Sequence, residues 1–287
     1  MSTRRDALRG LGAAGLVAFG SFGVAGPACA QDDAGPTALE RVKARGALNV
    51  ALYTQMPPFH DEGRGIDADL AKLLAEALDV RCSPLPFPAG ENMNDDLRNM
   101  VWKGHYLGYG PADVLLHVPV DAPLIEANPQ SRIFAPYYRD RVMIARSVKR
   151  VPHLETMAQL TGQPIAVCGE SLAGWLVLGA DGGAYRAETK TEFRDGVAAA
   201  QALLRNEFAA AAGNESELRS VLGGDDRFVI SPLPSLRAPR DGWAVGMAVK
   251  KDAGDLAKAL QAAIDAASAD GRLKAIFARG HLEWRPA

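Results

Sequence analysis

Three short polar stretches follow apolar, strand-like runs and are candidates for contact with a small ligand. His117 and Asp121 come after the run 112–116, and Ser171 opens a helical stretch. Asn214 ends a run of small residues. A serine at a helix start caps the helix, and it can also offer its hydroxyl and nearby backbone N–H groups to an anion. For His117, a half-buried histidine with a purely structural role is the alternative.

Patterns typical of catalysis and metal binding are missing from the sequence. The run Gly-Glu-Ser-Leu-Ala at 169–173 is not a Gly-x-Ser-x-Gly elbow, and no His-Glu-x-x-His occurs. Cys82 and Cys168 lack metal-type spacing, and two buried thiols are favoured over a disulfide. The glycine-rich loop 104–110 precedes Pro111 and a strand, so it is not a phosphate loop. We expect no cofactor, no metal and no enzyme activity.

Alternating strand-like and helical runs must position the candidate ligand residues named above. Strands are expected at 47–53, 112–116, 164–167, 209–212, 229–231 and 243–249, and helices at 67–78, 92–102, 171–178, 195–205, 215–222 and 254–277. This alternation predicts a mostly parallel sheet covered by helices, in the α/β class. Ligand sites in such sheets lie at the carboxyl ends of the strands. Asp67 and Asp69, at the start of one helix, are interpreted as favourable helix-start charges rather than an acid pair.

The overall composition is that of an ordinary globular protein. Of the 287 residues 48% are hydrophobic and 23% charged, which is enough apolar material for one large domain or two smaller ones. The net charge of −2 argues against a nucleic-acid or anionic-membrane partner, so a small solute fits better.

The N-terminal segment has the pattern of an export signal. Arg4-Arg5 stands ahead of the apolar run 11–24, and Ala28-Cys29-Ala30 closes it with a small-x-small cleavage signal. The run is shorter than the roughly 20 residues that span a bilayer. We expect a twin-arginine signal peptide at 1–30, a linker at 31–36, and a periplasmic protein without membrane insertion after cleavage. A general secretory signal and an N-terminal anchor are the alternatives.

Six segments form an ordered set over nearly the whole remaining chain. They are Glu40–Val50, Pro57-Pro58-Phe59, Gly65–Leu70, Phe134–Tyr138, Val167–Ser171 and Ala244–Asp252. Together they resemble family 3 extracellular solute-binding proteins, which are periplasmic receptors that hand polar solutes to ABC importers. The resemblance implies a periplasmic-binding-protein-like type II fold with two α/β lobes, a hinge and an interlobe cleft. It also implies that Phe59 stacks on a ligand.

The same resemblance implies how the chain divides into lobes. Lobe 1 is expected at 37–145 plus 246–287, and lobe 2 at 146–245. Strands near 139–145 and 243–249 would cross between them as a hinge, about which such receptors close on their ligand.

Two departures concern the groups with which this family holds an amino acid. An arginine is expected a few residues after 113–116, but no arginine occurs there until Arg132. An aspartate is expected where Asn214 stands. The charged ends of a bound amino acid would then be desolvated without partners, which argues against a free amino acid as ligand.

These departures and the run Pro136-Tyr137-Tyr138-Arg139 resemble a subgroup of the family. It comprises the J-type accessory proteins of quinoprotein methanol and alcohol dehydrogenase systems. The resemblance implies a solute-receptor fold that assists a pyrroloquinoline-quinone (PQQ)-dependent dehydrogenase. A receptor that delivers a polar solute to an ABC permease is the alternative. A periplasmic dehydratase using Glu170 or Asp121 is less favoured.

An accessory protein would need a surface for its partner. The candidate residues are aromatic or basic: His105, Tyr106, Tyr109, Tyr137, Tyr138 and Arg139. Tyrosine and arginine dominate protein–protein hot spots, which favours a partner-facing role. The alternative is that the two tyrosines at 137 and 138 are half-buried in a hinge strand.

Overall fold

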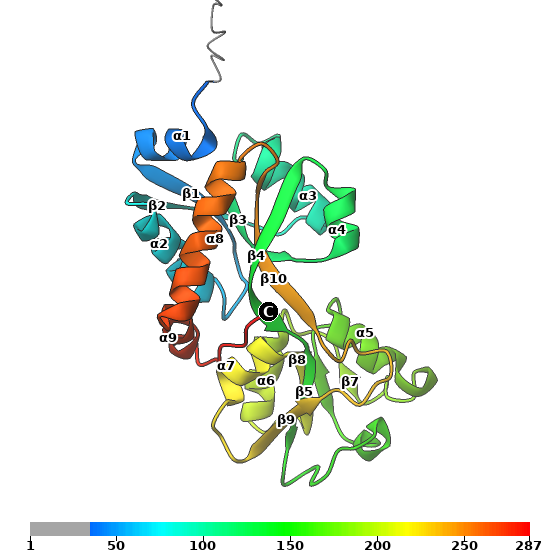
Figure 1. Cartoon of the computed structure of the whole chain (residues 1–287). Coiled ribbons are helices and arrows are strands. Elements are labelled where there is room, and N and C mark those ends of the chain that lie inside the picture. Colours follow the sequence, from blue (N-terminus) through cyan, green and yellow to red (C-terminus); the bar gives the residue numbers. More distant parts are fainter. Residues whose placement is uncertain (1–34) are drawn as a thin grey trace, which may run out of the picture. The chain divides into compact units, whose positions relative to one another are not determined.

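The structure is a computed structural model that describes residues 35–287. The expected signal peptide, at 1–30, lies outside the described residues, as does most of the expected linker at 31–36. Residues 36–287 form one compact unit built on two five-stranded sheets (Figure 1).

The first sheet has the strand order β2–β1–β3–β10–β4. Its strands are β1 (Ala47–Tyr53), β2 (Arg81–Phe87), β3 (Val114–Pro119), β4 (Ser131–Asp140) and β10 (Trp243–Lys250). β1 runs parallel to β2 and β3, whereas β10 runs antiparallel to β3 and β4.

The second sheet has the order β7–β6–β8–β5–β9. Its strands are β5 (Val142–Ser147), β6 (Ile165–Val167), β7 (Thr189–Lys190), β8 (Ala210–Asn214) and β9 (Phe228–Pro232). β6 is parallel to β7 and β8, and β5 is antiparallel to β8 and β9. Both sheets are therefore mixed. The expectation of a mostly parallel sheet is wrong, because β10 and β5, next to the connections between the sheets, run opposite to their neighbours.

Helices cover the sheets (Figure 1). They are α1 (Ala38–Arg45), α2 (Ile66–Ala77), α3 (Met93–Leu97), the π-helical η1 (Arg98–Trp102), α4 (Ala122–Ala127), the 3₁₀ turns η2 (Met157–Leu160) and η3 (Ala180–Gly182), α5 (Leu172–Gly179), α6 (Gly196–Leu204), α7 (Glu215–Leu222), α8 (Gly254–Ala269) and α9 (Arg272–Arg279). α1, α2, α8 and α9 pack with the first sheet, and α5, α6 and α7 with the second. Within 35–287, no helix is both long and apolar enough to cross a membrane.

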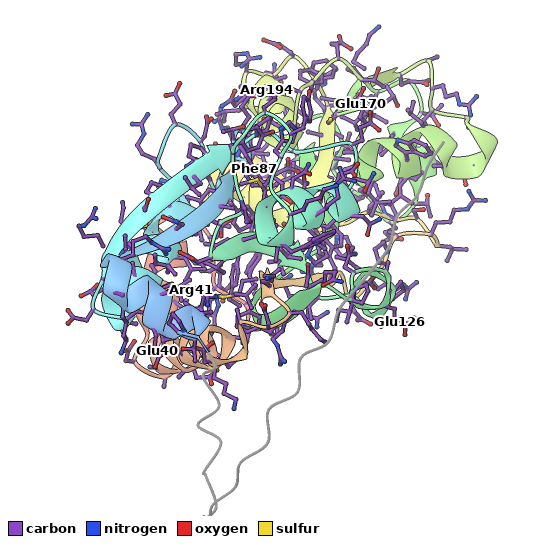
Figure 2. The ribbon with its side chains drawn as sticks, turned by 90° about the horizontal axis from the view of Figure 1, so that it is seen from above. Glu40, Arg41, Phe87, Glu126, Glu170 and Arg194 are labelled. Atoms are coloured by element: carbon purple, nitrogen blue, oxygen red, sulfur yellow. The ribbon has the colours of Figure 1, made fainter. Side chains whose placement is uncertain are left out.

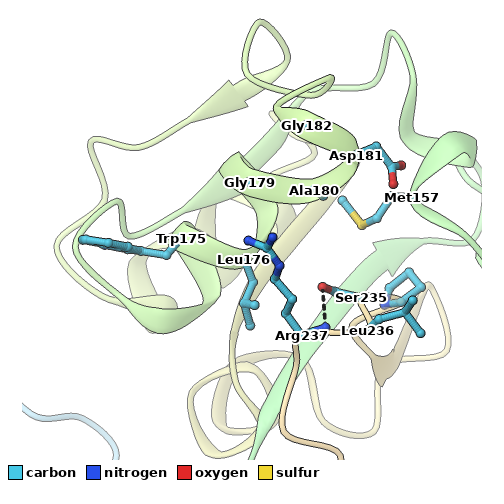
Figure 3. Close-up of a pocket in the computed structure, with 11 residues that line it drawn as sticks. Met157, Trp175, Leu176, Gly179, Ala180, Asp181, Gly182, Ser235, Leu236 and Arg237 are labelled. Atoms are coloured by element: carbon cyan, nitrogen blue, oxygen red, sulfur yellow. Dashed lines mark hydrogen bonds between the residues drawn. The ribbon is translucent and has the colours of Figure 1, made fainter.

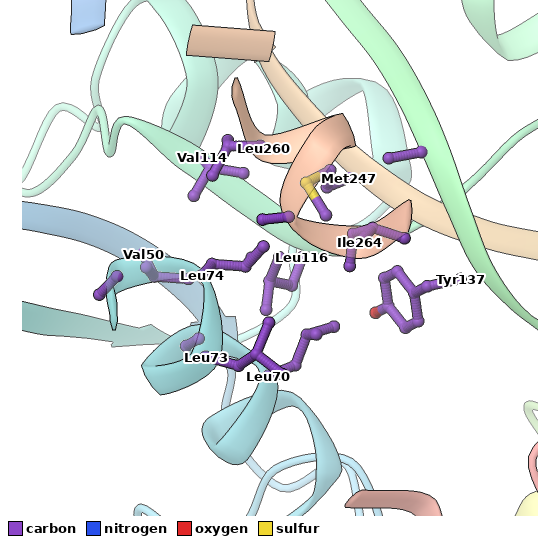
Figure 4. Close-up of a cluster of buried hydrophobic side chains, with 14 of the residues drawn as sticks. Val50, Leu70, Leu73, Leu74, Val114, Leu116, Tyr137, Met247, Leu260 and Ile264 are labelled. Atoms are coloured by element: carbon purple, nitrogen blue, oxygen red, sulfur yellow. The ribbon is translucent and has the colours of Figure 1, made fainter. Parts of the chain in front are cut away.

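Apolar side chains cover both faces of each sheet. On one face of the first sheet, Leu70 and Leu74 of α2 and Leu260 of α8 pack with Leu116 and Met247 (Figure 4). The leucines of α2 lie one helical turn apart and so share one face. On one face of the second sheet, a core forms around β5, β6, β8 and α5. Burial of this apolar surface is the main stabilising contribution on each side.

At Gly246, the pairing of strand β10 is irregular with both of its neighbouring strands, β3 and β4. Against β3 the register skips His117, and against β4 it skips residues 135–137. A Cβ atom on Gly246 would lie 2.4 Å from the backbone oxygen of Phe134, so only glycine fits between the two bulges. Bulges redirect side chains, and here they bring His117 and Tyr137 into contact.

Two connections join the sheets. The chain leaves β4 and enters β5 at Arg141, and it returns through residues 233–242 between β9 and β10. The C-terminal tail lies along the first connection. The indole Nε1 of Trp284 donates to the Tyr137 carbonyl at 2.8 Å, and the Arg285 guanidinium donates to the Arg139 carbonyl at 2.9 Å.

The division into two lobes stays a prediction, and the sheets place its boundaries differently. The expected boundary at residue 145 falls within β5, which belongs to the second sheet. The expected boundary at 245–246 falls within β10, which belongs to the first. On this topology the chain passes from one sheet to the other at Arg141 and at 233–242, and a hinge stays a prediction.

Candidate functional site

A buried polar cluster lies at the carboxyl-terminal half of β3. Asp67, in the first turn of α2, accepts a hydrogen bond from the Tyr137 hydroxyl at 2.8 Å and pairs with Nδ1 of His117 at 3.1 Å. The Tyr137 hydroxyl also accepts the backbone N–H of His117 at 3.1 Å, which the bulge leaves out of the sheet. Burial, and then the charge of Asp67, raise the pKa of Tyr137 well above its usual value. The phenol therefore remains a donor.

The interpretation of Asp67 as a helix-start charge is incomplete. Its side chain is only 4% exposed and faces His117 and Tyr137. Asp69 lies at the surface, where it pairs with Lys72 and Arg279. No signal in the sequence links Asp67 to residues fifty or seventy positions away, so only the fold reveals the cluster.

Phe59 lies inside this cluster. Its ring centroid is 4.1 Å from that of His117 and 5.9 Å from that of Tyr138, and the residue is 3% exposed. Almost no ring surface is left on which a ligand could stack, so Phe59 serves as the wall against which the imidazole packs.

A second set of charges lies at the connection between the sheets. Asp140, at the end of β4, accepts from the Ser216 hydroxyl at 2.5 Å, and burial raises its pKa. Next to it, Glu215 begins α7 and is 4% exposed. Although burial disfavours its charge, hydrogen bonds from Arg141 and Arg219 and the charge of Arg285 hold its pKa below the usual value.

The second sheet contributes the remaining expected ligand residues. Ser171 is the N-cap of α5: its Oγ accepts from the N–H of Gly174 at 3.1 Å and donates to the carbonyl of Cys168 at 2.8 Å. Asn214 ends β8, is half-buried, and donates its N–H to Glu217 at 2.8 Å. Both residues stand at the carboxyl ends of strands, as expected. Their ligand-binding role stays a prediction.

The carboxyl group of Glu217 joins the start of α7 to the start of α6, since it also accepts the N–H of Gly196 at 2.9 Å. Burial, opposed by these two backbone hydrogen bonds, raises the pKa of Glu217 to about 7. Between the usual carboxyl pKa and this value, the folded protein holds a proton that the unfolded chain has lost. Thermal stability should therefore fall as the pH rises from about 5 to about 8.

Melting curves across this pH range check the assignment to Glu217. In Glu217→Gln the pH-dependent loss should be smaller, because glutamine does not titrate. A constant difference in melting temperature between the two proteins at every pH would show that another group carries the effect.

The other expected residues lie outside the cluster. Asp121 is the exposed N-cap of α4 and accepts from the N–H of Leu124 at 3.2 Å. Glu170 is exposed on elements of the second sheet (Figure 2). Neither acid proposed for a dehydratase therefore reaches the buried polar groups.

The expected partner surface divides into exposed and buried parts. Tyr137 and Tyr138 are 1% and 2% exposed, so a partner-facing role for them is wrong. Arg139 is half-buried and donates to the Asp241 carbonyl at 3.3 Å, beside the second connection. The loop 104–110 is different. His105 stacks on Tyr109 at 4.2 Å, and Tyr106 is 88% exposed.

The best-formed hollows in the described part of the chain lie away from the cluster. A cavity of about 450 Å³ lies on the elements of the second sheet, lined by Trp175, Leu236 and Arg237 among others (Figure 3). Four further hollows are each lined by elements of one sheet alone. In the described part of the chain, no three His, Cys, Asp or Glu side chains are placed to hold a metal. Cys82 and Cys168 are free thiols, half-buried rather than buried.

No protein-family model and no curated protein matches the chain. Solved structures do resemble it. An ancestral cationic amino acid solute-binding protein is 17% identical with a TM-score of 0.66, over 86% of this chain and 100% of that one. An amino acid ABC transporter substrate-binding protein from Streptococcus pneumoniae, bound to L-arginine, is 18% identical with a TM-score of 0.59, over 86% and 99%.

A third structure, of the solute receptors for L-cysteine of Neisseria gonorrhoeae, is 20% identical with a TM-score of 0.57, over 84% of this chain and 92% of that one. At such identities the likeness shows the fold. The chain has the periplasmic-binding-protein-like type II fold, which confirms the fold class expected from the sequence.

Proposed function

We propose that this chain is the solute-binding receptor of an ABC importer and that it takes a polar solute other than a common amino acid. The observation that supports this is the type II fold combined with the cluster of Asp67, His117 and Tyr137 at the carboxyl-terminal half of β3. The neighbouring structures are solute-binding proteins, and their described ligands are amino acids. In this proposal the chain is a receptor and not an enzyme.

The proposed ligand groups come from both sheets. His117 stands on the first, and Ser171 and Asn214 stand at the strand ends of the second. A solute held between them would contact the Ser171 hydroxyl, the Asn214 amide and the His117 imidazole. The export signal expected at 1–30 agrees with a receptor that works outside the cytoplasm.

The common amino acids should not stabilise the protein. The chain has no arginine immediately after β3, and Arg132 lies at the exposed start of β4. Asn214 offers no negative charge to an ammonium group. Unpaired charged ends in a closed site cost several kcal/mol each, while micromolar affinity is worth about 8 kcal/mol in total. A thermal-shift screen of the twenty amino acids should show no saturable shift.

The same screen, extended to organic acids, polyols, amides and sugars, tests the receptor function itself. A saturable rise in melting temperature with one polar solute is the expected result. A saturable shift with a standard amino acid would return the chain to the amino acid receptors. The absence of a shift with any solute would contradict the receptor proposal.

The loop 104–110 favours one second candidate, an accessory factor for a quinoprotein dehydrogenase. Tyr106 and Leu107 are 88% and 68% exposed, and exposed apolar side chains that lie together suit a partner contact. None of the neighbouring structures described above is such an accessory protein. The solute screen separates the two candidates, because an accessory factor can act without binding a solute.

A further inference from the structure

The C-terminal tail after α9 runs from the helices of the first sheet to the start of α7 (Figure 1). Leu282 is 3% exposed and belongs to the apolar core on one face of the first sheet, and Trp284 packs against the same core. The indole of Trp284 also donates to the Tyr137 carbonyl of β4 at 2.8 Å. Up to Trp284, the tail is therefore fixed to the first sheet.

Arg285 joins this fixed tail to an element of the second sheet. One amino group of its guanidinium donates to the Arg139 carbonyl of β4 at 2.9 Å. The other amino group pairs at 2.9 Å with the carboxylate of Glu215, the first residue of α7. A guanidinium is a rigid, planar fork. This single group therefore holds a strand of the first sheet at a fixed distance from a helix that packs on the second.

The tail adds a non-covalent crossing to the two covalent connections between the sheets. Glu215 accepts from two further arginines, but Arg141 lies in a connection and Arg219 in α7 itself. Only Arg285 brings a link from a remote part of the first sheet. Successive Cα atoms lie only about 3.8 Å apart, so Arg285 has little slack beside the fixed Trp284. A bend at Arg141 that moves β4 away from α7 must break the pair with Glu215 or pull the tail from its site.

We infer that residues 282–287 form a strap that restrains the movement of the two sheets relative to each other, with Arg285 as its releasable link. Only hydrogen bonds and one ion pair hold this link, so it opens and closes without a change in covalent structure. Conformations with the link open lack a charge-assisted hydrogen bond, so the strap shifts the population toward the conformation described here. The inference goes beyond the proposed receptor function and does not depend on it.

Distances between two spin labels, one on each half of the molecule, test the inference by pulsed electron paramagnetic resonance without any solute. The exposed positions Lys258 on α8 and Gln201 on α6 are changed to cysteine to carry the labels. The free thiols at Cys82 and Cys168 are changed to serine so that they take up no label. This labelled protein is the parent for the variants below.

Two variants release the strap. In Arg285→Ala, the share of distances outside the main peak of the parent should rise about tenfold, which is the factor that one hydrogen bond to a charged group provides. A chain that ends at Glu283 also loses the indole contact of Trp284 and should show a still broader distribution. The bonds from Ser216 to Asp140 remain in both variants, so both should stay folded. Melting temperatures verify this.

Arg279→Ala is the matched control. Arg279 pairs with Asp69 at 2.8 Å, but both residues belong to helices of the first sheet, so the distances between the labels should not change. The inference is overturned if both release variants reproduce the distribution of the parent. It is equally overturned if Arg279→Ala broadens the distribution as much as Arg285→Ala does, because any lost ion pair would then loosen the molecule. Neither outcome bears on the receptor proposal, which the thermal-shift screen tests separately.

Discussion

Replacing Glu215 with alanine should lower the melting temperature by about 6 to 12 °C, the largest effect that we expect from removing one charge. The carboxylate is 4% exposed, accepts hydrogen bonds from Arg141 at 2.7 Å and from Arg219 at 2.6 Å, and forms an ion pair with Arg285 at 2.9 Å. These guanidiniums come from the sheet connection, from α7 and from the C-terminal tail. Breaking a buried ion pair costs about 3 to 5 kcal/mol. The arginines are partly exposed, so we take the lower end of this cost, about 3 kcal/mol. Each kcal/mol lowers the melting temperature by about 2 to 4 °C.

Glu207→Ala is the matched control. Glu207 pairs with Arg205 at 2.7 Å, but both side chains are at least half exposed. Exposed ion pairs contribute little to stability, so the melting temperature of this variant should equal that of the wild type. Differential scanning calorimetry compares the two. Equal melting temperatures for Glu215→Ala and Glu207→Ala would show that the three-arginine cluster does not stabilise the connection.

Gly246→Ala should destabilise the protein by about 3 kcal/mol or more, the upper end of the cost of overpacking. The added Cβ would lie 2.4 Å from the Phe134 carbonyl oxygen and 2.9 Å from Cγ2 of Val120. β10 cannot shift to make room, because β3 and β4 flank it on both sides. Urea unfolding measures the loss.

Gly179→Ala is the control for the methyl group itself. Gly179 ends α5 with a φ of −92°, and a Cβ there meets nothing within 4 Å. Alanine at such a position is neutral or slightly stabilising. If Gly246→Ala unfolds at the same urea concentration as Gly179→Ala, β10 is free to move between the bulges.

Several elements could be predicted from the sequence because local rules determine them. The strand 47–53 and the helix 215–222 have the bounds that apolar runs and capping residues indicate. β2 was not expected from the sequence, and its Pro84 and Pro86 are unfavourable in a central strand. It proves to be an edge strand, where proline is tolerated. Strand direction was mispredicted because periodicity reports which face is buried and not which neighbour pairs.

The candidate site was predictable only in part. Strand ends drew attention to His117, Ser171 and Asn214, and each stands where a strand finishes or bends, while their ligand-binding role stays a prediction. The partners of His117 were missed. Asp67 has a sufficient local explanation as a helix-start charge, and Tyr137 lies in the stretch of β4 that bulges opposite Gly246. Nothing in a linear pattern reports a bulge made by two distant strands.

The position of β10 also bears on how this chain folds as it emerges from the ribosome. β10 separates β3 from β4, yet it is synthesised after every strand of the second sheet. The first sheet therefore cannot close during translation of residues 47–242, whereas the second has all five of its strands by residue 232. Such long sequence separation slows folding and prolongs the exposure of unpaired strand edges. The first sheet, whose synthesis starts before that of the second, is therefore completed after it.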